Sequence, residues 1–407
     1  MKNVIVVGGG AAGFFAAIAC AENNPGYDIT ILEMSSQLLQ KVMVSGGGRC
    51  NVTHACFDPH QLVKYYPRGE KQLLGPFTKF NPTNTVEWFE GRGVKIKAEV
   101  DGRMFPGSDS SQTIIDCFMN EANRLGIKIK TVVGVEDLIP PTGAENKWQV
   151  ITNKNFGIAA DAVIVTTGSS SRMWNILSKL GHTIVPAVPS LFTFNIKDER
   201  IKGLEGLSVE NATVNITGDQ KLKTTGPLLI THWGMSGPAI LRLSAWGARV
   251  LADKKHLFEI NINWSSSEPG AVKETIKQFK QQHPKKAVAG NNLFGIPRRL
   301  WERFVQVAIN NPSWSTINFA DLSNKHIDQL ATEITAAWYR VTGKSTYKDE
   351  FVTAGGIELD EVDFKTMQSK KLPCLYFAGE VLDIDAITGG FNFQAAWTTG
   401  WIAGTSV

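Results

Sequence analysis

The chain has 407 residues, 43% of them hydrophobic, and a formal net charge of +4. This length allows two or three domains with ample core, and the composition is that of an ordinary globular protein, which excludes disordered and collagen-like classes. No apolar run is as long as a transmembrane helix, so no membrane association is expected. The basic clusters are small and typical of solvated surfaces, so a nucleic-acid partner is not expected either.

The cysteines indicate a reducing compartment. There are five, an odd number, and none shows C-x-x-C spacing. This pattern favours free thiols in a cytoplasmic protein over a disulfide framework. No histidine is spaced to complete a zinc site with them, so we predict no metal.

The first predicted element is a buried strand over residues 4–7 that runs into glycines and then a helix. Gly8 allows a tight turn, Gly10 allows backbone N–H groups to approach a pyrophosphate, and Gly13 allows the helix to pack close to its strand. A second strand over 28–32 ends in Glu33, about 20 residues past the last glycine, where an acid hydrogen-bonds ribose hydroxyls and disfavours a 2′-phosphate. The pattern predicts a dinucleotide cradle.

A secretory signal is the alternative for the same stretch. Lys2 and the apolar run to Ala21 resemble its charged and hydrophobic regions. Three consecutive glycines would weaken a signal helix, however, and cleavage near Ala21 would remove the strand that Glu33 requires. The dinucleotide interpretation is therefore preferred.

A second glycine cluster, residues 46–48, follows closely. It is flanked by polar residues, among them Lys41, Ser45, Arg49 and Asn51. A flexible surface turn explains the glycines but not these flanking side chains. We therefore expect the backbone to approach a long ligand a second time here.

The middle of the chain changes character. An apolar strand over 161–168 ends in Thr167 and Gly168 and is predicted to join the first sheet. From about 191, strands over 191–196, 208–216 and 256–263 give way to helices near 271–282, 297–310 and 327–338. We predict an FAD-type nucleotide domain over 1–190, an inserted substrate or cap domain over 191–346, and the return of the nucleotide domain over 347–407.

The last part of the chain repeats the first pattern. A strand over 375–378 ends in Gly379 and Glu380, and a glycine turn at 389–390 opens a helix. An extended FAD would use all three glycine-ended strands, with its ribityl chain near Gly379 and its flavin N1 and C2 carbonyl facing the new helix N-terminus, where the dipole stabilises negative charge. NAD would leave this last motif unused, so FAD is the predicted cofactor.

Three segments carry a family resemblance. Residues 45–53 (SGGGRCNVT), 231–244 (THWGMSGPAILRLS) and 377–400 closely resemble the BaiN-like flavoproteins, also described as the aminoacetone oxidase family or NAD(P)/FAD-dependent oxidoreductases. The resemblance spans nearly the whole chain. It implies an α/β fold with a Rossmann-like FAD-binding domain of glutathione-reductase type and an inserted β-plus-helical domain. One family member is associated with reducing a carbon–carbon double bond of an oxo-bile acid.

The resemblance also assigns the FAD site position by position. The ADP half is expected at one group of residues, with Val135 at the adenine: Gly8, Gly10, Ala11, Ala12, Gly13 and Glu33. The ribityl chain and flavin are expected at a second group: Lys41, Ser45, Gly46, Gly47, Asn51, Thr167, Gly168, Gly379, Glu380, Gly389, Gly390, Asn392 and Phe393. One departure stands out: the family's Gly- and Pro-rich segment after Gly168 is replaced by a shorter one, 169–174, so relatives' substrates need not transfer.

The predicted reaction follows from the cofactor. No second G-x-G-x-x-G unit is present, so we expect NAD(P)H to reduce the flavin as a transient donor and a small enone-like substrate to accept the hydride. His232 is the candidate acid and Arg49 the candidate oxyanion partner; His232 could instead cap the helix that begins at Pro238. Cys50 is a candidate redox thiol, although a packed small residue is the simpler interpretation.

Two alternatives remain open at this stage. The reduced flavin could react with oxygen in an oxidase or monooxygenase, which this fold also supports. The protein could instead be a flavin-binding sensor that touches RNA through Arg298, Arg299 and Arg303. The sequence does not indicate the oligomeric state.

Overall fold

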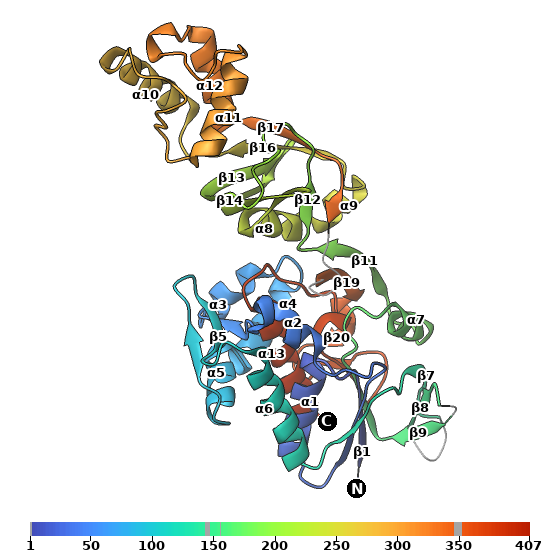
Figure 1. The fold of residues 1–407 in the computed structure, drawn as a ribbon. Coiled ribbons are helices and arrows are strands. Elements are labelled where there is room, and N and C mark those ends of the chain that lie inside the picture. The colour runs from blue at the N-terminus through green and yellow to red at the C-terminus, as the bar shows by residue number, and fades with distance from the viewer. Residues whose placement is uncertain (1, 143–146, 155, 346–351) are drawn as a thin grey trace. The chain divides into compact units, whose positions relative to one another are not determined.

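The computed structural model describes residues 2–142, 147–154, 156–345 and 352–407. The chain forms two compact units (Figure 1): unit 1 comprises Met1–Pro189 with Lys348–Val407, and unit 2 comprises Ser190–Tyr347. The first unit is thus built from both ends of the chain, and the second from its middle.

Unit 1 is organised around a seven-stranded sheet in the order β20-β21-β22-β10-β1-β2-β6. The strands from β22 to β6 are parallel, and β21 and β20 continue antiparallel. The parallel strand predicted over 161–168 is therefore confirmed beside β1. The strand bounds are β1 (Asn3–Val7), β2 (Asp28–Leu32), β6 (Lys128–Lys130), β10 (Ala162–Val165), β20 (Val362–Asp363), β21 (Gln368–Ser369) and β22 (Leu375–Phe377).

Two buried helices lie side by side in unit 1 (Figure 1). They are α1 (Ala11–Asn23) and α13 (Phe391–Thr405), the first and last helices of the chain. Their contact depends on small residues: a Cβ added at Gly404 would lie 2.2 Å from the Ala16 carbonyl oxygen, and one at Gly400 would lie 2.8 Å from that of Ala12. The chain ends therefore come together through close backbone packing.

Smaller elements complete unit 1. The helices are α2 (Gln40–Gly48), α3 (Pro59–Leu62), α4 (Glu70–Lys79), α5 (Pro82–Glu90), α6 (Ser111–Arg124) and α7 (Ser171–Lys179). One three-stranded sheet contains β3 (Thr53–His54), β5 (Arg103–Pro106) and β4 (Ile96–Ala98), and another contains β7 (Val135–Ile139), β8 (Trp148–Thr152) and β9 (Gly157–Ala160). A two-stranded sheet pairs β11 (Ile184–Ser190) with β19 (Val352–Ile357).

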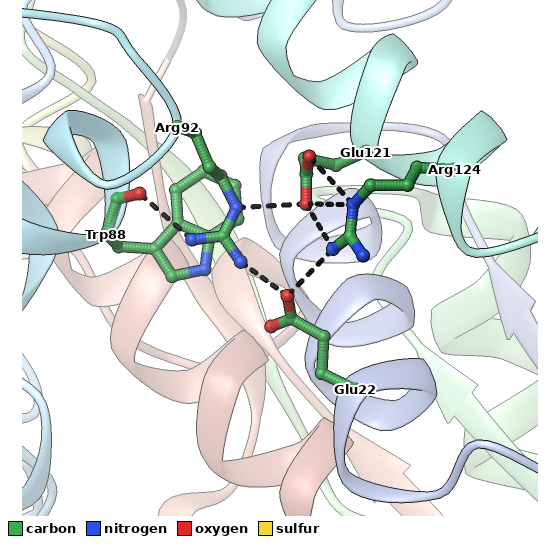
Figure 2. A network of polar contacts seen from close by, with 5 residues as sticks. All are labelled: Glu22, Trp88, Arg92, Glu121 and Arg124. Carbon is green, nitrogen blue, oxygen red and sulfur yellow. Dashed lines mark hydrogen bonds and ion pairs between the residues drawn. The ribbon is translucent and has the colours of Figure 1, made fainter.

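A charge network fastens the C-terminal end of α1 to its neighbours (Figure 2). Arg92, after α5, pairs with Glu22 of α1 at 2.5 Å and with Glu121 of α6 at 3.2 Å. Its guanidinium lies 3.8 Å from the centre of the Trp88 ring, and Arg124 joins both carboxylates. These contacts lie at the end of α1 opposite to its glycine turn.

Unit 2 is a seven-stranded sheet, β17-β16-β13-β14-β15-β12-β18, with helices packed on it. Helices α10 to α12 gather at one end of this unit in Figure 1. The bounds are β12 (Thr193–Asn195), β13 (Ser208–Ile216), β14 (Asp219–Thr231), β15 (Gly234–Ser236), α8 (Pro238–Trp246), α9 (Ala248–Asp253), β16 (Phe258–Asn263), α10 (Pro269–Gln282), α11 (Arg298–Ile309), α12 (Asn324–Thr335), β17 (Ala337–Val341) and β18 (Lys344–Ser345).

Two features of unit 2 differ from the sequence prediction. The helix predicted over 327–338 ends at Thr335, because burial alternates from Ala337 to Val341 and this period of two belongs to a strand. The long strand β14 was not predicted, since its first half is polar. None of the helices within the described ranges combines the length and hydropathy needed to cross a bilayer.

Candidate FAD-binding site

The first glycine turn has the shape of a phosphate cradle. Gly8 adopts φ +113°, and a Cβ there would lie 2.7 Å from the Thr166 carbonyl oxygen. A Cβ at Gly13 would lie 1.9 Å from the Gly8 oxygen, so α1 packs directly on the turn. A Cβ at Gly10 would meet nothing within 4 Å, and no side chain caps α1 there. The uncapped N–H groups and the open space at Gly10 suit a diphosphate.

Glu33 closes the next part of the cradle. Its two carboxylate oxygens accept hydrogen bonds from the backbone N–H groups of Gly9 and Ser35, each at 2.7 Å. Each oxygen keeps a further lone pair for a ribose hydroxyl. The carbonyl of Glu33 accepts from the N–H of Val133 at 2.9 Å, which brings Val135 and the start of β7 close to the same strand end.

A buried hydroxyl beside the turn also suits a polar ligand. Thr166 Oγ1 donates toward the carbonyls of Val7 and Gly8, at 3.0 Å each, and so joins β10 to the glycine turn. The next residue, Thr167, has a buried Oγ1 with no hydrogen-bond partner among the described residues. A Cβ at Gly168 would meet nothing within 4 Å. An unpaired buried hydroxyl is costly unless a ligand satisfies it.

The second glycine cluster is a kink inside α2. Ser45, Gly46 and Gly47 leave helical geometry, with φ of 58° at Gly46 and 69° at Gly47. A Cβ at Gly46 would lie 3.0 Å from the Phe105 ring, whereas Gly47 faces open space. The Ser45 hydroxyl donates to the Val42 carbonyl at 3.0 Å. The kink thus exposes backbone in the way that the sequence predicted for a long ligand.

An ion pair connects α2 to the short turn that follows β22. Lys41 of α2 forms a 2.5 Å ion pair with Glu380, in the 3₁₀ turn η4 (Gly379–Val381). Gly379 adopts φ +73°, and a Cβ there would lie 2.9 Å from the Ala12 Cβ. Gly379, one of the predicted ribityl residues, therefore lies against the first turn of α1.

The start of α13 is held by buried hydrogen bonds. When the Asn51 amide is oriented so that both its oxygen and its nitrogen form hydrogen bonds, the oxygen accepts from the N–H of Gly390, the N-cap residue of α13, at 3.0 Å. Gln394 Oε1 accepts from the hydroxyls of Thr53 at 2.6 Å and Thr85 at 2.9 Å, and all three side chains are fully buried. Tyr66 Oη donates to the Phe391 carbonyl at 2.6 Å.

Other predicted residues in this region shape the loop before α13. Asn392 bridges the loop, accepting from the Ala386 N–H at 2.9 Å and donating to its carbonyl at 3.1 Å. Phe393 stacks on the Trp397 ring with centres 5.3 Å apart, and a Cβ at Gly389 would lie 2.8 Å from the Phe391 ring. No side chain caps α13, so its N–H groups remain available to a flavin carbonyl.

The two catalytic candidates have different surroundings. Arg49 lies in unit 1, pairs with Glu99 at 2.7 Å and Asp109 at 3.6 Å, and stacks over the Phe105 ring. His232 is exposed on the turn between β14 and β15 of unit 2. The suggestion that it caps α8 is wrong, because Gly237 is the N-cap residue and no side chain caps this helix.

The structure also addresses the cysteines and metal ligands. All five cysteines are free. Burial raises the pKa of Cys50 to about 12, which favours a protonated thiol that packs in the core over a nucleophile at neutral pH. Within the described ranges no three His, Cys, Asp or Glu side chains form a group that could hold a metal. The absence of a metal remains a prediction.

Sequence reasoning missed the residues that hold α13. Thr53, Thr85 and Gln394 belong to three distant segments and meet only in the fold. One signal was available: Gln394 is a long polar residue in a predominantly apolar helix that is buried along most of its length. Such a side chain needs buried partners.

Together, the parallel sheet, the uncapped glycine turn and Glu33 define a dinucleotide-binding Rossmann protein. The profile described as HI0933-like protein Rossmann domain matches residues 2–406, and the chain belongs to this family. It is an FAD-dependent oxidoreductase of the BaiN-like type, and the predicted family and α/β fold class are confirmed.

Three named relatives are similar along nearly their full length. The 3-dehydro-bile acid delta(4,6)-reductase of Clostridium scindens is 27% identical over 415 residues, covering 99% of this chain and 98% of the relative. The ribosomal RNA dihydrouridine synthase of Escherichia coli is 25% identical over 413 residues, covering 98% and 96%. A protein of the same name from Haemophilus influenzae is 27% identical over 413 residues, covering 99% and 98%.

Solved structures share the fold. The 3-ketosteroid-delta4-(5alpha)-dehydrogenase of Rhodococcus jostii, in complex with 4-androstene-3,17-dione, superposes with a TM-score of 0.52 at 12% identity, covering 100% of this chain and 96% of the other. The 3-ketosteroid delta1-dehydrogenase of Sterolibacterium denitrificans gives 0.50 at 11% identity, covering 99% of each chain. At this identity the likeness describes the fold alone.

Proposed function

We propose that this protein uses FAD and NAD(P)H to reduce a carbon–carbon double bond conjugated to a carbonyl group. The observation that carries the proposal is the pair of uncapped helix starts, α1 and α13, in unit 1: Gly379 packs against Ala12 in the first turn of α1, and Asn51 bonds Gly390 at the start of α13. FAD, when bound, supplies the hydride-transfer chemistry.

The names of the relatives support this bond type. A delta(4,6)-reductase of a 3-dehydro-bile acid and a dihydrouridine synthase both add hydrogen across a double bond that is conjugated to a carbonyl. The steroid and the pyrimidine share little else. The common reaction is therefore a firmer basis for this chain than either substrate, especially since residues 169–174 depart from the family pattern.

The residues of the chain have assigned tasks in this proposal. The first turn of α1 binds the diphosphate, Glu33 the adenosine ribose, and the α13 start stabilises negative charge on the flavin pyrimidine. His232 and Arg49 keep the roles that the sequence suggests for them, His232 as the candidate acid and Arg49 as the candidate oxyanion partner. Arg49 already neutralises Glu99 and Asp109, so its role requires one of these pairs to loosen.

The test is an anaerobic titration of the FAD-loaded protein followed by its visible spectrum. We expect NADH or NADPH to bleach the flavin bands, and a 3-oxo-Δ4 steroid acid to restore them without oxygen. Bands that neither nucleotide bleaches would contradict the donor. Bands that only oxygen restores, with peroxide release, would favour the oxidase alternative. His232→Gln is expected to slow the restoration while leaving the bound FAD unchanged.

A second candidate substrate is uridine in RNA. The helical part of unit 2, residues 269–335, contains nine Lys or Arg and five Asp or Glu, a net charge of +4 that equals that of the whole chain. A net positive charge of this kind favours polyanions. Salt-sensitive retention of RNA, together with loss of uridine absorbance after reduction, would support this substrate, and retention without uridine loss would contradict it.

A further inference from the structure

One arginine of unit 2 lacks the partners that comparable arginines have. The half-buried Arg68, Arg92 and Arg200 all pair with carboxylates. Arg242, on α8, is also half-buried, and its Nε is shielded from solvent. Among the described residues, however, this Nε has no hydrogen-bond partner, and Arg242 forms no ion pair. A half-buried guanidinium in this state favours an anion.

A second hydrogen-bond donor lies near the Arg242 guanidinium, across a glycine. Gly226 of β14 is buried, and a Cβ added to it would meet only two atoms within 4 Å: the backbone N of Ala239 at 3.9 Å and Nη1 of Arg242 at 4.0 Å. Both atoms are hydrogen-bond donors. The missing side chain of Gly226 thus leaves a notch bordered by a guanidinium and by an N–H of the first turn of α8.

The strand next to the notch is irregular. The pairing of β13 with β14 shifts between Val209 and Ala212, opposite Leu228 and Gly226. Such bulges re-aim backbone and are common beside binding sites. On the same side, the Thr224 hydroxyl donates to the Ala239 carbonyl at 2.7 Å, which fixes the first turn of α8 against β14. The notch is therefore held by the fold and does not depend on a mobile loop.

We propose that Arg242, Gly226 and the Ala239 N–H form an oxyanion-binding site in unit 2, which accepts a carboxylate or phosphate group of a ligand. The guanidinium supplies a charge-assisted hydrogen bond, and the Ala239 N–H supplies a second donor that no Gly226 side chain separates from it. The choice of ligands below rests on the proposed function, whereas the site itself does not.

The direct test observes the Arg242 Nε–H group in FAD-loaded protein labelled with ¹⁵N-arginine. The resonance is assigned by its loss in Arg242→Lys. Inorganic phosphate and acetate are titrated against chloride at matched ionic strength, and we expect a saturable shift of this resonance with the oxyanions only. Arg340 serves as an internal control, because it is exposed and also lacks a partner among the described residues. A shift that never saturates, or an equal shift at Arg340, would overturn the site.

The ligand source is tested by binding, without turnover. Calorimetry compares a 3-oxo-Δ4 steroid acid with its methyl ester, and uridine 5′-monophosphate with uridine. We expect one charged member to bind about 10- to 100-fold more tightly than its neutral match, an advantage that Arg242→Gln removes and Arg340→Gln keeps. The steroid pair would assign a carboxylate and the nucleotide pair a phosphate. Equal binding within both pairs would overturn the oxyanion site, even if the flavin titration succeeds. If the flavin titration fails but the charged ligand still binds more tightly than its neutral match, only the proposed function is overturned.

Discussion

The two glycine-started helices of unit 1 look alike in sequence but are held in place differently. Helix α1 is fixed by backbone: Gly13 packs on the Gly8 carbonyl, and Gly8 packs on the end of β10. Helix α13 also has a close backbone contact, since a Cβ at Gly390 would lie 2.4 Å from the Thr53 carbonyl oxygen. It is held in addition by side chains, through Asn51, Gln394 and their buried partners. The first helix start therefore rests mainly on backbone contacts with the ends of β1 and β10, whereas the second also requires side chains from distant parts of the chain.

The difference affects how each start responds to change. Where a glycine packs directly on backbone atoms, any added side-chain atom clashes, whatever its chemical type. A buried polar network tolerates changes of volume better than the loss of a hydrogen-bond acceptor. Substitutions at the α1 start should therefore act through steric clashes, and substitutions at the α13 start through lost hydrogen bonds.

The largest effect is expected at Gly13. The Cβ of Gly13→Ala would lie 1.9 Å from the Gly8 oxygen, so α1 must move away from β1. A distortion that costs about 3 kcal/mol of FAD-binding free energy corresponds to roughly a 100-fold loss of FAD affinity. We expect both this loss and a lower melting temperature of the FAD-free protein, measured by calorimetry and circular dichroism.

Gly10→Ala is the matched control in the same turn. Its Cβ would meet nothing within 4 Å of the protein, so the FAD-free protein should melt as the unmodified chain does. Its methyl group would occupy the space assigned to the diphosphate, so FAD binding should still weaken. Normal FAD affinity in Gly10→Ala would show that the diphosphate does not approach this turn.

The next largest effect is expected at Gln394. Gln394→Met keeps the volume but leaves the Thr53 hydroxyl without its acceptor and the Thr85 hydroxyl with only the longer 3.3 Å bond to the Asn81 carbonyl, which costs about 2 kcal/mol of unfolding free energy. If the α13 start faces the flavin, its displacement also lowers the flavin midpoint potential by about 10–20 mV. Thr405→Ala, at the far end of α13, should leave the potential unchanged.

The same contrast separates what the sequence predicted from what it did not. The Gly8–Gly13 turn, Glu33 and the parallel partner over 161–168 follow from spacing within short segments, and the structure places them together. The network around Gln394 could not be assigned, because a sequence pattern does not state which distant threonines a buried amide will meet. A resemblance supplied Asn51 and Gly390, but the hydrogen bond between them came from the fold.

A third prediction concerns the far end of α1 and yields a smaller effect. Arg92→Met removes two ion pairs and a cation–π contact at a side chain that is 17% exposed, so we expect about 1–2 kcal/mol of lost unfolding free energy. FAD affinity should not change, because the glycine turn is held by its own backbone. A clear loss of FAD affinity would show that the α1 start depends on its distant side chains as α13 does.

The smallest effect on stability is expected at the ion pair between α2 and the turn η4. The Lys41 side chain is 47% exposed and Glu380 is 18% exposed, so Lys41→Met should cost no more than about 0.5–1 kcal/mol. A double-mutant cycle with Glu380→Gln isolates the energy of the pair, both for unfolding and for FAD binding. If Lys41 and Glu380 both touch the ribityl chain, their coupling will be larger for FAD binding than for unfolding. Equal coupling in both measurements would assign the pair to the fold alone, and the α13 side of the site would then rest on the Gln394 network.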